Sequence, residues 1–536
     1  MIKNLGCFGY TETAFFLLAI KKLQFLLPFN LFSFTLCVLI MLLMKNIKSI
    51  ILIVPLLLFG GTLYSQKDTI LLTFDQLIEI ARNKSPHSAM ARHTFKASYW
   101  QYRSYRAGYL PSLSLTSLPL GINRSLTSYT LPDGSDTFIE RRGNNSSVQL
   151  NLAQKVPFTG GEFSIGSALQ RTDFFTDSLT ATSYMLNPVN ISYKQPLFTF
   201  NPYKWERKIE PIRYEEAKKQ FQSRLEEISQ RAVQQFFDLV LAQINTEISR
   251  INYQNNDTLY KIAQGRYNIG TIARDELLQM ELTLLNSQNA YKQSLNDYED
   301  YHFRLRSFLG YPNTVILKIV VPDSVPNVVI DSDKALELAL KNNPKMLAIQ
   351  RNKIEAEREV ARTKSERIFN ADLFLSFGLS KTGNEIKRLT EDMLDQQMVS
   401  VGLSIPLVDW GRGKGRYKMA LSNLDLTKIT GEQEQLDFEQ QIFLQVLKFN
   451  MQKDQIITAA KADTISQLRF EVAKQRFMVG KVAITDLNIA GNERDGARRN
   501  YVSAIRDYWL NYYALRGLTA FDFIRNEEIT VDLETE

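Results

Sequence analysis

Apolar residues recur along this chain with two different periods, and the two periods follow one another in a repeated order. Over Thr73–Gly108, and again from about Ile209 to Gly310, they recur every three to four positions, as in amphipathic helices. Over Pro111–Phe200 they alternate with Ser, Thr, Asn and Gln, as in strands. The same order begins again at Asp333 and ends near Ala520. The pattern predicts a mostly α-helical fold in which a helix–strand–strand–helix unit occurs twice.

In each half, the long helical pattern is interrupted once by a short stretch that contains a glycine. The first stretch is Ala263–Leu277, and Ala473–Leu487 repeats it 210 residues later. A glycine between two helical runs is a turn signal, so each stretch is predicted to be the tip of a helical hairpin. The aligned tip residues are Arg266 with Arg476, Tyr267 with Phe477, and Gly270 with Gly480.

The spacing of equivalent residues locates an insertion in the first half. Asp75–Pro86 matches Asp333–Pro344 at an offset of 258 residues. The strand end Pro196 matches Pro406 at an offset of 210, and this second offset holds through the tips. The first half therefore contains 48 extra residues, the difference between 258 and 210, and they lie in the strand region.

The N-terminal stretch 1–64 is far more apolar than the rest of the chain. Lys45 and Lys48 precede an apolar core at Ile50–Phe59 and a small-residue end, which is the layout of a secretory signal peptide cleaved near Ser65. Residues 1–40 are then an upstream extension; a transmembrane helix at about 25–43 is the alternative. The predicted divisions are a leader at 1–65, a first repeat at 66–310, a linker at 311–332, a second repeat at 333–520 and an acidic tail at 521–536.

Composition narrows the class of protein. With 44% hydrophobic and 23% charged residues, the chain is neither disordered nor a polytopic helical membrane protein. Basic and acidic residues are interspersed, so a nucleic-acid partner is not expected. Both cysteines, Cys7 and Cys37, lie in the leader, and His87, His93 and His302 lack ligand spacing. We therefore expect no enzymatic activity, no cofactor and no metal.

Alternating strands of about ten residues fit either a soluble sheet or a transmembrane β-barrel. The export signal and the small number of strands beside very long helices favour the barrel. Trp205 and Trp410 follow the strands that end at Phe198 and Leu407, where an aromatic belt at the lipid–water interface would lie. Ordinary packing at a helix start is the alternative for each Trp. Two strand pairs cannot close a barrel alone, so several chains must share it.

In this order, the features resemble those of the TolC-like outer-membrane efflux proteins. The resemblance covers the chain from Thr73 to Ala520. It rests on the duplicated unit, the strand ends Gln195–Leu197 and Ile405–Leu407, and the tip pattern Arg-aromatic-x-x-Gly. It implies a homotrimer with a 12-stranded barrel in the outer membrane and an α-helical tunnel in the periplasm. Its partners would be a periplasmic adaptor and an inner-membrane transporter, and its cargo drugs or proteins. A periplasmic adaptor or a coiled-coil structural protein of the cell envelope is the alternative.

The resemblance also implies that acidic residues line the mouth of the tunnel, six and nine positions after each tip glycine. Glu276 and Asp486 occupy the first of these positions, whereas Gln279 and Ile489 occupy the second. One ring of carboxylates would remain and would favour cations. The alternative is a solvated first helical turn, where the helix dipole favours acids.

The resemblance makes the tips the expected adaptor-docking surface, formed by Arg266, Tyr267, Gly270, Arg476, Phe477 and Gly480, with the glycines allowing close helix approach. The Tyr and Arg that close the family's entrance are replaced here by Phe477 and Val482, so that latch is not available in the same form. Arg266, Arg274 and Arg476 are the candidates to replace it. For the 48 extra residues, the choices are a plug-like extracellular hairpin or extra barrel strands, and we expect the hairpin.

Overall fold

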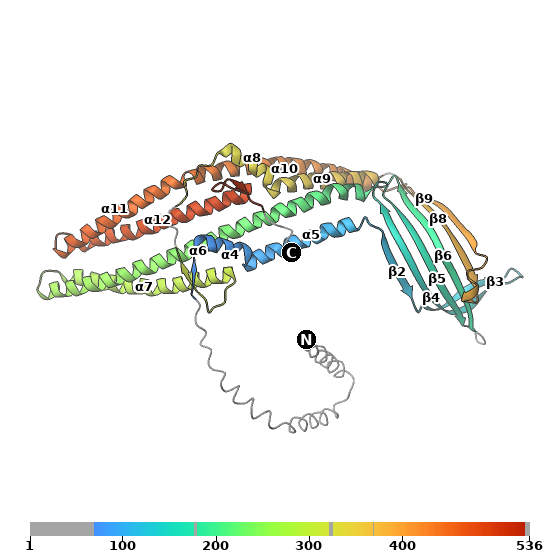
Figure 1. Ribbon diagram of the computed structural model, residues 1–536, viewed down its shortest axis with the longest axis horizontal. Coiled ribbons are helices and arrows are strands. Elements are labelled where there is room, and N and C mark those ends of the chain that lie inside the picture. The colour runs from blue at the N-terminus through green and yellow to red at the C-terminus, as the bar shows by residue number, and fades with distance from the viewer. Residues whose placement is uncertain (1–68, 176–179, 321–324, 368, 531–536) are drawn as a thin grey trace, which may run out of the picture. The chain divides into compact units, whose positions relative to one another are not determined.

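The structure is a computed structural model that describes residues 69–175, 180–320, 325–367 and 369–530. The predicted leader at 1–65 and the end of the predicted tail at 531–536 lie outside these ranges. Helices make up most of the described chain, and most strands gather in one large sheet (Figure 1). The prediction of a mostly helical fold with a duplicated unit that carries strands in both halves is confirmed.

Two matching helix pairs open the two halves. The first pair is α4 (Phe74–Asn83) and α5 (Pro86–Ala107), and the second is α8 (Ser332–Asn342) and α9 (Pro344–Ser365). The helices α5 and α9 both have 22 residues, and both begin with a proline. Proline suits the first position of a helix because its missing N–H would have no partner there. The offset of 258 found in the sequence therefore describes real helix boundaries.

Long hairpins follow in both halves. The first hairpin consists of α6 (Pro202–Asn268) and α7 (Arg274–Leu309), and the second of α10 (Arg412–Asn450), α11 (Gln452–Met478) and α12 (Ile484–Thr519). The 67 residues of α6 span about 100 Å at 1.5 Å per residue. The predicted start of α6 near Ile209 was too late, because Asn201 caps the helix by accepting the N–H of Tyr203 at 3.0 Å.

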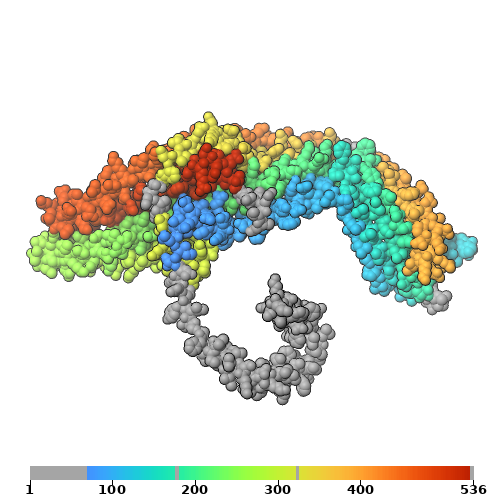
Figure 2. Space-filling view, in the orientation of Figure 1, coloured from blue at the N-terminus to red at the C-terminus, as the bar shows by residue number. Residues whose placement is uncertain are grey.

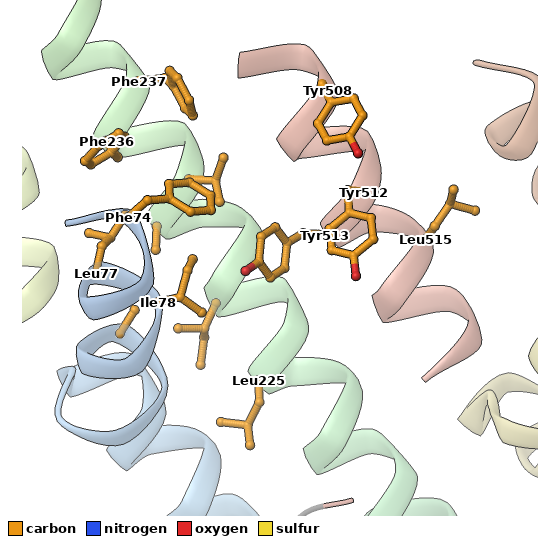
Figure 3. Close-up of a cluster of buried hydrophobic side chains, with 14 of the residues drawn as sticks. Phe74, Leu77, Ile78, Leu225, Phe236, Phe237, Tyr508, Tyr512, Tyr513 and Leu515 are labelled. Carbon is orange, nitrogen blue, oxygen red and sulfur yellow. The ribbon is translucent and has the colours of Figure 1, made fainter. Parts of the chain in front are cut away.

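The main hydrophobic core joins the two halves. Phe74 of α4 lies 5.8 Å from Phe236 of α6 and 4.5 Å from Trp509 of α12, measured between ring centroids. Figure 3 shows this cluster, in which Phe74 at the N-terminal end of α4 lies near Phe236 and Phe237 of α6 and Tyr513 of α12. Each buried aromatic ring removes roughly 150–250 Å² from water. Because the core takes residues from both repeats, the two halves fold as one body.

Short strands lie in the predicted linker and at the start of the predicted tail, and they hold both segments in place. β1 (Thr69–Leu72) pairs in parallel with β7 (Ile316–Ile319), which lies inside the predicted linker. β10 (Phe521–Asp522) pairs with β11 (Glu527–Glu528) at the start of the predicted tail. Phe521 and Asp522 are both buried. These strands are too short to show a period, so the sequence did not predict them.

The large sheet is antiparallel, with the order β2-β4-β5-β6-β8-β9. β3 pairs with the first part of β4 and β2 with the last part, so β2 and β3 occupy one strand position. The strands are β2 (Ser112–Leu118), β3 (Ile122–Thr130), β4 (Asp136–Val156), β5 (Gly161–Phe175), β6 (Thr180–Leu197), β8 (Asn370–Gly383) and β9 (Leu394–Ser404).

In the described part of the chain, this sheet therefore has six strand positions, more than the two pairs predicted. The expectation that the 48 extra residues form a plug-like hairpin was wrong for most of them. Residues 142–156 of β4 pair with β5, and β5 pairs with β6, so they belong to the sheet. Only β3 and the first residues of β4 extend past β5, in a hairpin that turns at Gly134, where φ is +84°. Backbone pairing with β3, β2 and β5 makes β4 a strand along its whole length. Alternation in the sequence alone did not predict this pairing.

Candidate channel surfaces at the hairpin tips and the sheet

Each hairpin tip forms where a glycine ends the incoming helix. Gly270 has a φ of +75°, and its N–H donates to the carbonyl of Tyr267 at 2.9 Å. The N–H of Thr271 donates to the carbonyl of Arg266, also at 2.9 Å. The second tip repeats both bonds 210 residues later, around Gly480. This pair of bonds is the Schellman motif, which requires a left-handed residue and so favours glycine.

The tip glycines are needed for their backbone conformation and not because space is short. Among the described residues, no heavy atom lies within 4 Å of a Cβ built on Gly270. A Cβ on Gly480 would meet only the Arg266 Nη2, at 3.9 Å. The close approach of adaptor helices expected at these glycines concerns a partner and stays a prediction. The positive φ is the requirement, because a side chain in the left-handed region costs roughly 1–2 kcal/mol.

Arg266 joins the first tip to the second. Its Nη2 donates to the carbonyl of Met478 at 3.1 Å, and its guanidinium lies 5.7 Å from the ring centroid of Phe477. The Met478 carbonyl belongs to the last turn of α11, where carbonyls lack helical partners and the helix dipole favours a cation. Phe477 is buried with Phe470 and Leu487. Arg266 therefore supplies a polar contact between the tips, although the Tyr and Arg of the family latch are replaced.

The two acidic residues of the predicted ring occupy equivalent places. Glu276 lies in the first turn of α7 and Asp486 in the first turn of α12, and both are exposed. The residues that precede these helices, Ala273 and Ala483, have no side-chain oxygen to cap them. An acidic side chain near an uncapped helix start is favourable in any case. Tyr267 and Arg476 are exposed beside them.

A buried polar network joins α6 to α12 near the tips. Asp495 of α12 is buried and accepts a hydrogen bond from the Nδ2 of Asn252 at 2.6 Å. Arg494 donates to Asp495 Oδ1 at 2.6 Å and to Asn252 Oδ1 at 2.9 Å. Its guanidinium also lies 3.9 Å from the ring centroid of Phe470. This network could not be predicted from the sequence, because each member resembles part of a solvated helix face until α6 and α12 are paired.

A second cluster of charges lies between the two halves. Glu226 of α6 is fully buried and pairs with Arg82 of α4 and with Arg516 of α12. Arg516 also pairs with Asp522 at 2.8 Å, and the hydroxyl of Tyr512 donates to the same carboxylate. Burial alone would raise the pKa of Asp522, but the bond from Tyr512 and the charge of Arg516 lower it below its usual value. The cluster fastens the C-terminal segment to both repeats.

The large sheet has one apolar and one polar face across all six strand positions. The register places Leu113, Leu152, Ile165, Ile191, Phe377 and Gln397 in one row. The adjacent row, on the opposite face, consists of Ser112, Ala153, Ser164, Ser192, Ser376 and Met398. The apolar side chains are exposed, by 67% at Leu113 and 53% at Phe377. An exposed apolar face opposite a polar one is typical of a membrane barrel wall.

Exposed aromatic residues mark the end of the sheet that joins the helices. Trp410 lies between β9 and α10 and is 96% exposed in the single chain. Trp205 lies in the first turn of α6 and is half-buried, with the Nζ of Lys208 5.0 Å from its ring centroid. The structure adds Phe158, in the turn between β4 and β5, and Phe198, after β6. The sequence missed both because a single aromatic residue in a turn has no pattern.

Across the described residues, none of the helices is long and apolar enough to span a bilayer.

The chain matches the family model of the outer membrane efflux proteins over residues 77–311 and 335–520, which together make up most of its length. It therefore belongs to that family, and the predicted resemblance and outer-membrane location are confirmed. Two solved structures share the fold. The CmeC outer membrane channel of Campylobacter jejuni is 14% identical, with a TM-score of 0.61 over 86% of this chain and 87% of that chain. VceC of Vibrio cholerae is 13% identical, with a TM-score of 0.58 over 84% and 96%.

A curated relative matches a smaller part of the chain. The alkaline protease secretion protein AprF of Pseudomonas aeruginosa is 22% identical over 253 residues. That match covers 44% of this chain and 50% of AprF, so the chain spans about half the length of this relative.

Proposed function

We propose that the protein is the outer-membrane exit duct of an efflux or type I secretion system. It would be a passive channel for small molecules or proteins that an inner-membrane transporter delivers, and it would carry out no chemistry. The observation that carries the proposal is the continuity of a two-faced sheet with very long helices. Only four residues separate β6 from α6, which then runs about 100 Å to the first tip. CmeC, described as an outer membrane channel, and AprF, described as a secretion protein, support this function.

We propose a homotrimer because α10 has two apolar faces. Phe438 and Ile442 face the core of their own chain and are buried. Ile429, Leu436 and Phe443 recur every seven residues on another side of the helix, and each is more than half exposed. A heptad of exposed apolar residues is typical of a helix that packs against a second one. In the assembled duct, the neighbouring copy would cover this face.

At the tips, the trimer would present six carboxylates, two from each chain, at Glu276 and Asp486. Such a ring would favour cations at the mouth. An adaptor would dock against the exposed tip surface that includes Tyr267 and Arg476. At the other end of the helices, Trp410 and Trp205 would lie at the lipid–water interface on the periplasmic side of the outer membrane.

The experiment compares two glycine substitutions in cells that lack their own exit duct and carry the matching adaptor and pump. Gly480→Leu forces a side chain into a left-handed position, whereas Gly265→Leu places one on an open helical position inside the first tip stretch, before its turn. We expect Gly480→Leu to abolish efflux while the trimer still reaches the outer membrane. Gly265→Leu should leave efflux unchanged. Normal efflux by Gly480→Leu would contradict the role of the tips, and a protein that is released without detergent would contradict the duct.

A further inference from the structure

The additional strands of the first half are long enough to cross a membrane. Residues 142–156 of β4 pair with β5 over its whole length, from Gly161 to Phe175. This is 15 paired residues in each strand, and a membrane-spanning strand needs roughly 9–11. β4 and β5 lie between β2 and β6, so they separate strands that would otherwise be neighbours. This position makes β4 and β5 part of the barrel wall. If they formed a plug inside the barrel, β2 would instead be free to pair with β6.

β4 and β5 also carry the same two faces as the strands beside them. Leu150 and Leu152 of β4 lie on the apolar face, in register with Ser167 and Ile165 of β5. Gln149 and the other alternate residues lie on the polar face. A plug inside a water-filled lumen would not need an apolar face that continues the one on its neighbours. A lipid-facing wall does need one, because every strand of a membrane barrel alternates between lipid and lumen.

Among the residues that the structure describes, nothing pairs with the outer side of either edge of the sheet. Every residue of β2 and of β9 is exposed. β2 leads away from α5, whereas β9 leads back to α10, so the two edge strands run in opposite directions. They can therefore pair in the antiparallel manner that a barrel with an even number of strands requires. A second copy of this chain is the partner that supplies the matching edge.

We propose that three copies close a barrel of 18 strands, with six strands from each copy and β9 of one copy paired with β2 of the next. This inference rests on the homotrimer of the proposed function, and it replaces the 12 strands implied by the family resemblance. Barrel diameter grows roughly linearly with strand number, so the exit would be about one and a half times as wide. At this width the barrel is an open aqueous pore, as in porins of 16–18 strands.

The lining of this pore is polar, with several uncharged rows and one charged row, Lys155, Glu162 and Lys194, near the helices. The register places Ser114, Asn151, Gly166, Asn190, Gly378 and Gln396 side by side on the polar face. Hydroxyl and amide groups solvate a hydrated cargo of either charge. A wide exit of this kind would not select by size, and selection by size would belong to the tips. The class of cargo that fits this exit is a bulky hydrated solute, such as an extended polypeptide.

The first test asks whether β4 belongs to the wall. The chain after the leader has no cysteine, so single cysteines can carry spin labels without background. We compare Leu150→Cys with Gln149→Cys, its neighbour on the opposite face, in trimers reconstituted in lipid vesicles. We expect the label at 150 to be accessible to oxygen dissolved in the lipid, and the label at 149 to a water-soluble nickel complex. Accessibility of both labels to nickel alone would mean a plug and would overturn the proposal.

The second test counts the copies around the barrel. Ser114→Cys on the polar face of β2 is combined with a cysteine at Gln396, Met398, Ser400 or Gly402 on the same face of β9. We expect one or two adjacent pairs to cross-link and to give covalent species up to a trimer on a denaturing gel. Ser114→Cys with Val399→Cys, on opposite faces, is the control and should not cross-link. If the largest cross-linked species were a dimer, the barrel would have 12 strands. If no pair cross-linked, β2 would have another partner.

These outcomes distinguish a failure of the 18-stranded barrel from a failure of the proposed function. A trimer that restores efflux but fails either test overturns the 18-stranded barrel and leaves the proposed function standing. A protein that is absent from the outer membrane overturns the proposed function and the barrel together. Each double variant is scored beside its two single-cysteine parents, which should all restore efflux, so a folding defect is recognised before cross-linking is read.

Discussion

At the scale of single residues, Glu226 is the buried charge that holds the two halves together. Glu226→Ala would leave Arg82 and Arg516 without the carboxylate that both of them pair with. Breaking a buried ion pair from one side costs about 3–5 kcal/mol. We therefore expect a large fall in the unfolding temperature of the purified protein. The control is Glu247→Ala, whose partner Arg250 is exposed, and it should have little effect. Equal falls in the two variants would contradict the assignment.

Protonation of His302, at the junction of α7 and β7, is expected to make the stability of the protein depend on pH. Its Nε2 accepts the N–H of Leu317 at 3.0 Å, and burial together with the charge of Arg306 lowers its pKa below the usual value of about 6.5. Between the lowered pKa and about 6.5, the unfolded chain binds more protons than the folded one, so stability is lost as the pH falls through this window.

The measurement is the unfolding temperature at pH 7.5 and at pH 5.5. Wild type should lose more stability over this interval than His302→Gln, whose side chain does not titrate. His93→Gln, at an exposed position of α5, is the control and should keep the pH dependence of the wild type. An unchanged pH dependence in His302→Gln would show that other groups are responsible.

At the scale of elements, the contact between the two hairpins predicts the behaviour of the mouth. Arg266→Ala removes the hydrogen bond to Met478 and the contact with the ring of Phe477. If this contact holds the tips together, its loss should raise the ion conductance of the trimer in planar bilayers. Arg476→Ala removes the equivalent arginine of the second tip, which is exposed, and is the matched control. A similar rise in both variants would mean that charge at the tips matters and the specific contact does not.

Helices and strands differ in how well the sequence predicts them. Turns between helices depend on local chemistry, so the tip glycines predicted the two hairpin turns correctly. The role of β4 and β5 depends on which strands they pair with, and alternation within one strand carries no information on its neighbours. The network of Asn252, Arg494 and Asp495 was missed for the same reason, because it exists only once α6 lies against α12.

At the scale of the whole molecule, the exposed apolar residues of α10 predict how copies assemble. Leu436 is 60% exposed in the single chain, although it lies on a long ordered helix in a row with Ile429 and Phe443. Burying a leucine side chain is worth roughly 1.5–3 kcal/mol, and a trimer gains this once per copy. Figure 2 shows the second hairpin (orange) lying along the first (green).

Leu436→Glu should therefore prevent assembly while the chain still folds, because the substituted position is exposed in the monomer and a charge placed in the interface would be desolvated without a partner. The measurement is the mass of the detergent-solubilised protein by light scattering, with helix content from circular dichroism as the test of folding. Asn423→Glu adds the same charge at an exposed position on a different side of α10 and should remain trimeric. A trimer formed by Leu436→Glu would place the interface elsewhere. A monomer with native helix content would show that this face of α10 closes the duct and that the unpaired strand edges alone do not hold three copies together.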